Sequence, residues 1–162
     1  MGDWFVHCQQ MDTCEARLKQ TLGIARRAQA ENDLMWEIHY PFPYADPRFV
    51  ETYLSLSDAS GAGHIDGIQA SRRTLRETLD PGDWEYMVWQ EWKEGLARTI
   101  ENRIRRRLGL PGNHGGGEPP FDRAVFYEGG SRLIAALERH EPELLQEIER
   151  LFRRLSELDR PG

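Results

Sequence analysis

Residues 34–44, LMWEIHYPFPY, alternate between large apolar side chains and other residue types. Every second position carries a leucine, an isoleucine or an aromatic ring. On a helix these positions would scatter around the axis, whereas on a strand they share one face. Two prolines near the end exclude a helix interior and a central sheet position, because proline has no N–H to donate. The pattern predicts a strand over 34–40 that continues as an extended edge over 41–44.

Three other segments have a strand-like pattern. DWFVHCQ at 3–9 is aromatic and β-branched, with apolar side chains at alternate positions, and predicts a strand. RFVETYLSLS at 48–57 alternates again and follows a turn, ADP. It predicts the second strand of a hairpin, with a helix over 47–56 as the alternative. DRAVFYE at 122–128 predicts a further short strand.

Other apolar positions recur with the helical period. Asp12 and Glu15 match the N-cap and capping-box positions of a helix that extends to about residue 32. Residues 66–79 predict a second helix. The longest helical pattern covers 83–109, where acidic residues come early and arginines late, as the helix dipole favours.

The C-terminal part begins with a glycine- and proline-rich run, PGNHGGGEPP. It predicts a linker over 111–121 between a body at 1–110 and a helical segment at 122–162. Two helices are expected in that segment, SRLIAALERH and one that starts at Pro142. The last helix has apolar residues spaced by four and three, too few for a coiled coil, so it is expected to pack on the body or on a partner. These residues are Leu144, Ile148, Leu151, Leu155 and Leu158.

The predicted fold class is α+β and predominantly helical. An N-terminal βαββ unit packs on a long amphipathic helix, and a C-terminal helical hairpin follows. The alternative is an all-α fold, which requires residues 34–57 to be irregular or helical.

The chain length of 162 residues suits one domain with a hydrophobic core. The net charge of −6 disfavours broad nonspecific binding of nucleic acid and favours solubility or a basic partner. Only Lys19 and Lys93 are lysines among the 21 basic residues. An arginine bias of this kind fits interface contacts, and it also fits a GC-rich genome.

The expected compartment is the cytoplasm. The start, MGDWFVHCQQ, has no basic region and no long apolar run, so it predicts no signal peptide. No stretch of the chain is apolar enough to span a bilayer. Cys8 and Cys14 are not spaced as a redox CxxC pair and are expected to be reduced thiols.

Three residues form a candidate chemical site. In the predicted sheet, His7, Glu37 and His39 would share the face opposite the core. Two imidazoles and a carboxylate can bind a metal or act as an acid–base pair. A solvated sheet face is the ordinary alternative for such polar positions.

The segment DWEYMVWQEW holds three of the five tryptophans. Trp84 and Trp92 share one helix face with Val88, and Trp89 widens it. Tryptophans of this kind are typical of protein interfaces, and they also fill cores.

The segment ARTIENRIRRR carries the basic cluster of the chain. Arg98, Arg105 and Arg106 are expected on the exposed side of the helix, opposite Ile100 and Ile104. Such a patch can hold phosphate or an acidic protein, and pairing with glutamates of the same helix is the alternative.

No catalytic motif is present. The glycine-rich segments fit neither GxxxxGK[ST] nor GxGxxG, and GxSxG, HExxH and Glu-x-x-His pairs are absent. The sequence therefore predicts a non-enzymatic protein-interaction module without metal or cofactor: a subunit, an adaptor or an acidic inhibitor of a larger complex. Its partner would be another protein or protein complex. A basic or nucleic-acid-binding protein is one candidate for that partner. Self-association stays open, and no membrane contact is expected.

Two alternative functions remain. One is a metal-dependent or acid–base enzyme that uses His7, Glu37 and His39. The other is direct nucleic-acid binding by the arginine-rich helix at 98–107.

Overall fold

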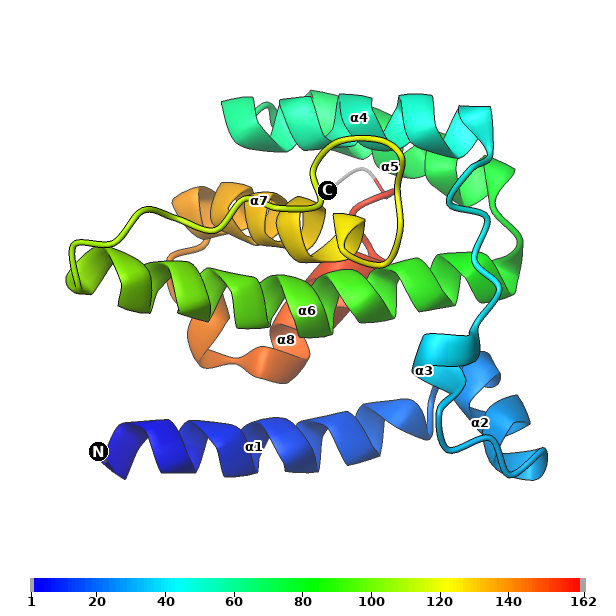
Figure 1. The fold of residues 1–162 in the computed structure, drawn as a ribbon, viewed down its shortest axis with the longest axis horizontal. Coiled ribbons are helices and arrows are strands. Elements are labelled where there is room, and N and C mark those ends of the chain that lie inside the picture. Colours follow the sequence, from blue (N-terminus) through cyan, green and yellow to red (C-terminus); the bar gives the residue numbers. More distant parts are fainter. Residues whose placement is uncertain (1, 161–162) are drawn as a thin grey trace.

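A long helix, α6 (Pro81–Arg107), runs through the middle of the molecule (Figure 1). The computed structural model describes the backbone of residues 2–160 and the side chains of residues 11–160. Pro81 occupies the first turn of α6, where its fixed φ suits a helix and its missing N–H is not needed. Asp83 lies in the first turn and Arg105, Arg106 and Arg107 lie in the last, which suits the helix dipole.

Helix α7 (Val125–His140) packs directly along α6. The two backbones approach closely at glycines, because a Cβ on Gly95 would lie 2.6 Å from the carbonyl carbon of Gly130. A Cβ on Gly130 would collide with the backbone oxygen of Glu91. This contact fixes how α7 presents its side chains beside the C-terminal half of α6.

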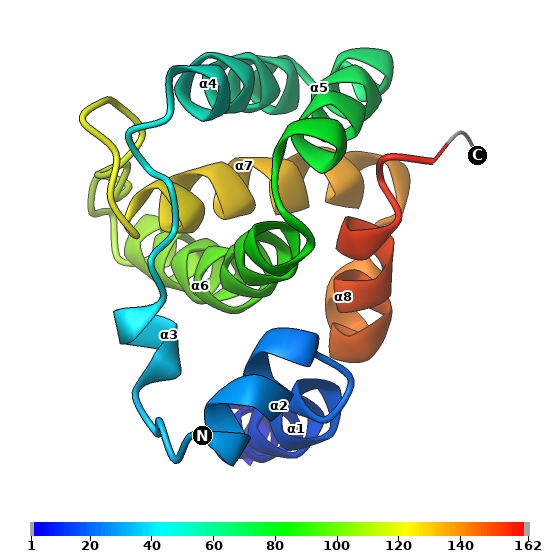
Figure 2. The same ribbon diagram turned by 90° about the vertical axis from the view of Figure 1, so that its right-hand side faces the viewer.

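Helices α4 (Pro47–Ala62) and α5 (Ile65–Thr78) pack on each other (Figure 2). Gly63 joins them in the left-handed conformation, with φ of 73°. Helix α4 also packs on α7, and α5 also contacts α6. Helix α8 (Ile148–Ser156) follows the short 3-10 turn η1 (Leu144–Gln146) and packs on α6 and α1.

The remaining helices lie on the side of α6 that faces away from α7. They are α1 (Gly2–Lys19), α2 (Gly23–Ala30) and the single turn α3 (Trp36–His39). Figure 2 shows α1 and α2 below α6, and α3 beside α6 on the side turned away from α7.

The predicted α+β class is wrong, and the all-α alternative fits. Over residues 2–160 the structure has eight α-helices and no strand, so the βαββ unit is absent. The segment at 3–9 lies inside α1. The segment at 48–57 lies inside α4, because Asp46 accepts hydrogen bonds from the N–H groups of Arg48 and Phe49 and so caps a helix there.

The segment at 34–44 is a strap over helices and does not join a sheet. It contains a turn, α3 and an extended stretch that leads to α4. Phe42 is buried, with its ring 5.2 Å from that of Phe126, and Tyr40 stacks on Tyr86 at 4.4 Å. In the extended stretch after α3, successive side chains turn to opposite sides, as in a strand. The apolar alternation is not matched by burial before that stretch, because α3 is a helical turn and Leu34 and Ile38 are exposed.

The predicted strand at 122–128 is likewise helical from Val125 onward. The domain boundaries predicted near 110 and 122 stay a prediction. In the structure α7 packs on both α6 and α4, and α8 packs on α6.

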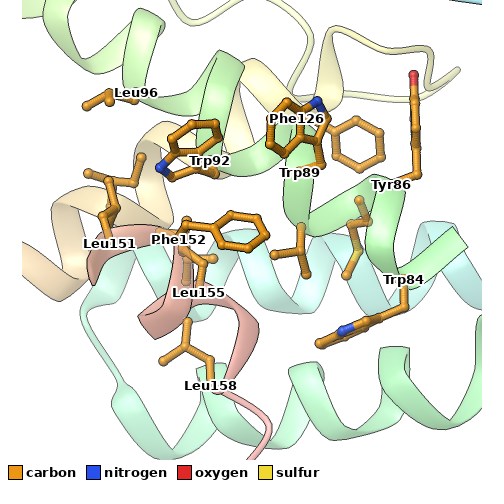
Figure 3. Close-up of a cluster of buried hydrophobic side chains, with 14 of the residues drawn as sticks. Trp84, Tyr86, Trp89, Trp92, Leu96, Phe126, Leu151, Phe152, Leu155 and Leu158 are labelled. Atoms are coloured by element: carbon orange, nitrogen blue, oxygen red, sulfur yellow. The ribbon is translucent and has the colours of Figure 1, made fainter. Parts of the chain in front are cut away.

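The core is built from rings on α6 and aliphatic residues on α8 (Figure 3). The Trp92 indole Nε1 donates a hydrogen bond of 2.9 Å to the Ile148 backbone oxygen, and the Trp92 and Phe152 rings lie 5.6 Å apart. All five apolar residues of the four-and-three pattern are buried: Leu144, Ile148, Leu151, Leu155 and Leu158. That stripe packs on the body, one of the two outcomes that its spacing predicts.

A buried ion pair ties four helices together. The Arg72 guanidinium on α5 lies 2.5 Å from the Glu91 carboxylate on α6, and both side chains are fully buried. The Tyr53 hydroxyl on α4 donates to the same carboxylate at 2.9 Å. Arg72 also donates to the backbone oxygen of Leu155 on α8 at 2.8 Å, and its guanidinium lies over the Trp84 ring.

Candidate functional site

The three tryptophans predicted at an interface belong to the core. Trp84, Trp89 and Trp92 are all buried. Trp89 and Trp92 pack on Phe152 of α8 (Figure 3), and Trp84 lies under the Arg72 guanidinium of α5. In this conformation they are not available to a partner.

Glu37 and His39 lie on α3 but face different neighbours. The His39 ring Nδ1 lies 3.1 Å from the Asp33 carboxylate on the exposed side. Glu37 points to α6 and pairs with Lys93 at 3.0 Å and with Lys19 at 3.0 Å. The side chain of His7, on α1, lies outside the described residues. The described side chains hold no group of three or more His, Cys, Asp or Glu placed to bind a metal.

Glu37 belongs to a cluster of alternating charges that holds α1 and α3 on α6. Glu15 contacts Lys19 at 2.7 Å and Lys93 at 3.1 Å, so each lysine meets two carboxylates. These are the only lysines of the chain. A compact ammonium with three donors suits a position between two carboxylates better than a planar guanidinium does.

Partial burial and the opposite charges act on these groups in different directions. Burial acts to raise the pKa of Glu37, but the hydrogen bonds and charges of Lys93 and Lys19 outweigh it and lower the pKa below 4.5. Burial acts to lower the pKa of both lysines, but hydrogen bonds to Glu15 and Glu37 raise the pKa above 10.5. Glu37, Lys19 and Lys93 are therefore charged near neutral pH, and their ion pairs can hold α1 and α3 on α6.

The arginines of α6 do not form one exposed face. Arg98 is buried and donates to the backbone oxygens of Asn113 and Gly115, both at 3.2 Å. Arg105 donates to the Pro111 backbone oxygen at 2.7 Å. Arg106 is exposed, and no hydrogen bond or ion pair joins it to the part of the chain that the structure describes.

Arg106 lines a cleft between the C-terminal half of α6, one side of α7 from Glu128 to Glu138, and the loop that joins the two helices. The cleft has a volume of about 440 Å³. Its charged lining consists of three arginines and a histidine against two glutamates. These residues are Arg103, Arg106, Arg132, His114, Glu128 and Glu138.

Glu128 organises the inner wall of the cleft. It is almost fully buried on α7 and accepts a hydrogen bond from the Arg132 Nε at 2.7 Å. The His114 Nδ1 lies 3.2 Å from the same carboxylate oxygen, and the Arg98 guanidinium lies 3.9 Å from the other oxygen. A buried carboxylate surrounded in this way orders the cations that line the cleft.

The loop that carries His114 is held against α6. The Asn113 N–H donates to the Asn102 side-chain oxygen at 2.6 Å, and the Asn102 amide donates back to the Asn113 backbone oxygen at 3.0 Å. Gly116 has φ of 94°, and a Cβ there would lie 2.5 Å from the Ala124 backbone oxygen. Only glycine fits this close return of the loop to α7.

The lining can bind an anionic group. Glu128 is already occupied by Arg132 and His114, and Glu138 pairs with Arg103 at 2.5 Å. One outer nitrogen of Arg132 donates to the Ser57 hydroxyl at 3.2 Å, and one of Arg103 donates to Glu138. Arg106 and the other outer nitrogen of each of these two arginines remain to meet a carboxylate or a phosphate. The cleft also has two apolar wall residues, the small Ala135 and the large, exposed Leu110.

Most of this site cannot be recognised from the sequence. The sequence marks Arg106 as a candidate, but it places His114 in the predicted linker at 111–121 and Glu128 in the predicted strand at 122–128. The i,i+4 spacing of Glu128 and Arg132 is visible in the sequence once 125–140 is taken as a helix.

The fold and the cleft together define an all-helical protein with a cation-lined cleft beside its central helix. Comparisons with protein-family models, with curated proteins and with solved structures return no match to this chain. Among the described residues, no helix has both the length and the apolar character that crossing a membrane requires.

Proposed function

We propose that the protein is an interaction module that binds an acidic segment of a partner protein in the cleft between α6, α7 and the 108–124 loop. One observation carries this proposal: a chain with net charge −6 gathers three arginines and a histidine around one cleft and orders two of them on a buried glutamate. Arginine is the residue best suited to bidentate recognition of carboxylates.

The size of the cleft limits what enters it. A volume of about 440 Å³ fits one or two side chains, such as adjacent acidic residues or a terminal carboxylate beside an aliphatic residue. Leu110 would contact that aliphatic residue, and Arg106 would meet the carboxylate. The role remains that of a subunit or adaptor. A cytoplasmic location is part of the proposal, and the free, buried Cys14 fits a reducing compartment.

Fluorescence polarisation with labelled decapeptides tests the proposal. One peptide carries Asp, Glu and Leu, a second carries Asn and Gln in place of the acids, and a third probe is a single-stranded oligonucleotide. We expect binding of the acidic peptide alone. The double variant Arg103→Glu/Arg106→Glu is expected to weaken that binding at least about tenfold, because it reverses the charge of the cleft.

The matched control is Arg150→Glu/Arg153→Glu, which reverses two exposed arginines on α8 and leaves the cleft intact. It should bind the acidic peptide like the unaltered protein. Equal binding of the acidic and the amide peptides would contradict the proposal. Steeply salt-dependent binding of the oligonucleotide in place of the peptide would support nucleic-acid binding instead.

A further inference from the structure

Large exposed apolar side chains occur in two groups besides Leu110. The first group lies on and before α3: Leu34, Met35 and Ile38 are 93%, 50% and 59% exposed. The second lies near the end of α6, where Ile104 and Leu108 are 44% and 67% exposed. Groups of this kind on a small protein mark interaction surfaces when they share one side of the molecule.

Both groups lie on the same side of α6. Tyr86, Gln90 and Lys93 form the stripe that α3 covers, since all three contact Glu37. The spacing of four and three continues this stripe through Ala97 and Ile100 to Ile104 and Leu108. The face that α3 covers near the start of α6 is therefore the face that is uncovered near its end.

We call the first group, Leu34, Met35 and Ile38 on and before α3, the step. We call the second group, Ile104 and Leu108 near the end of α6, the ledge. α3 stands on α6 and turns Ile38 outward, and the C-terminal end of α6 continues beyond it as the ledge (Figure 1). From Tyr86 to Ile104 the helix rises about 27 Å, so one small contact cannot cover both groups. Two antiparallel copies, face to face, place the step of each on the ledge of the other.

Charge supports the same pairing. Glu31 and Asp33 lie beside the step, in the segment that leads to α3. Arg105 and Arg107 flank the ledge, one on each side of the stripe. Arg105 is paired with Glu101 at 3.7 Å, so among the described residues Arg107 supplies the uncompensated positive charge there. In an antiparallel pair, acidic residues of each copy meet arginines of the other around an apolar centre, which is the usual anatomy of an interface.

We propose that two copies of this chain form a closed, twofold-symmetric dimer in which the α3 step of each copy packs on the Ile104–Leu108 ledge of the other. A twofold contact is isologous, so every step-to-ledge contact occurs twice and leaves no free end. The surface is distinct from the cleft: Arg106 lies two residues after Ile104, roughly 200° around the helix. The dimer and the cleft can therefore be tested separately.

Sedimentation equilibrium of the full chain over a concentration series tests this dimer. The unaltered protein should reach twice its monomer mass of 18.8 kDa and no more. Ile38→Lys puts a cation against the arginines of the ledge, and Ile104→Glu puts an anion against the acidic residues of the step. Each is expected to raise the dissociation constant at least about tenfold. The combined variant Ile38→Lys/Ile104→Glu should restore the dimer, because the new lysine then meets the new glutamate in both contacts.

Circular dichroism checks that each variant is folded. We expect it to be, because Ile38 and Ile104 are exposed and not part of the core. Three results would overturn the proposal: a monomer at all concentrations, single variants that associate like the unaltered protein, or growth beyond a dimer. Oxidation of a mixture of Ile38→Cys and Ile104→Cys chains provides a second test. A disulfide between the two kinds of chain, absent when the unaltered protein is oxidised, supports the pairing, and its absence contradicts it.

Discussion

Arg72 and Glu91 show how much of this fold depends on single residues. Their ion pair has no access to solvent, and Tyr53 and the Leu155 backbone oxygen make further hydrogen bonds to it. The buried Arg72 Nε has no hydrogen-bond partner in the described part of the chain. Burial, followed by the charge of Glu91 and its hydrogen bond, raises the pKa of Tyr53, which therefore stays a hydroxyl donor. A buried pair of this kind adds less to stability than its distance suggests, but the removal of one partner is costly.

Arg72→Met is predicted to lower the free energy of unfolding by about 3–5 kcal/mol, because Glu91 would remain buried without its counter-charge. Arg72→Met/Glu91→Met should be clearly less destabilised than the single variant, since no charge is left unpaired. Urea unfolding followed by tryptophan fluorescence measures both. Equal stability of the unaltered protein and Arg72→Met would show that the pair does not hold α5 on α6.

Two of the three helices predicted before residue 110 were right, and the one predicted from an N-cap at Asp12 to about residue 32 was wrong. Asp12 lies inside α1 (Gly2–Lys19), and a separate α2 (Gly23–Ala30) follows. The helices expected at 66–79 and 83–109 occur as α5 (Ile65–Thr78) and α6 (Pro81–Arg107). The strap at 34–44 was not predictable, because an alternating apolar pattern does not reveal whether the segment joins a sheet or crosses helices, and Leu34 and Ile38 of that pattern are exposed. The cleft was beyond local patterns too, since His114 and Glu128 meet only after the loop folds back on α7.

The attachment of α1 and α3 to α6 is expected to depend on pH. The pKa of Glu37 is lower in the folded state than its ordinary 4.5, so its charge adds stability above about pH 4.5 and loses that contribution as pH falls through the lowered value. The pKa of Lys19 and that of Lys93 lie above 10.5, so their contribution is full below pH 10.5 and is lost as pH rises through the raised values.

Glu37→Gln is therefore predicted to be less stable than the unaltered protein at neutral pH, and the difference should shrink as pH falls below 4.5. Urea midpoints across a pH series measure this. Asp58→Asn, a change at an exposed acidic position on α4, is the control and should show no such convergence. A difference that stays constant into acid would mean that the charge of Glu37 does not fasten these helices.

At the scale of the whole molecule, α6 separates two surfaces. Its side toward α7 borders the cationic cleft, and its side toward α3 carries the step and the ledge. A dimer formed through the second surface leaves both clefts open, so each copy could bind an acidic segment. Two linked sites would bind a partner that carries two such segments more tightly than either site alone.

An NMR titration of the ¹⁵N-labelled protein with the acidic decapeptide tests most directly whether the cleft is the binding site. We expect shifts concentrated in the loop around His114, at the start of α7 from Glu128 to Arg132, and in the side-chain signals of Arg103 and Arg106. The Asn and Gln peptide should leave those signals in place. Shifts scattered over other helices, or none in a folded sample, would contradict the assignment of this cleft as the binding site.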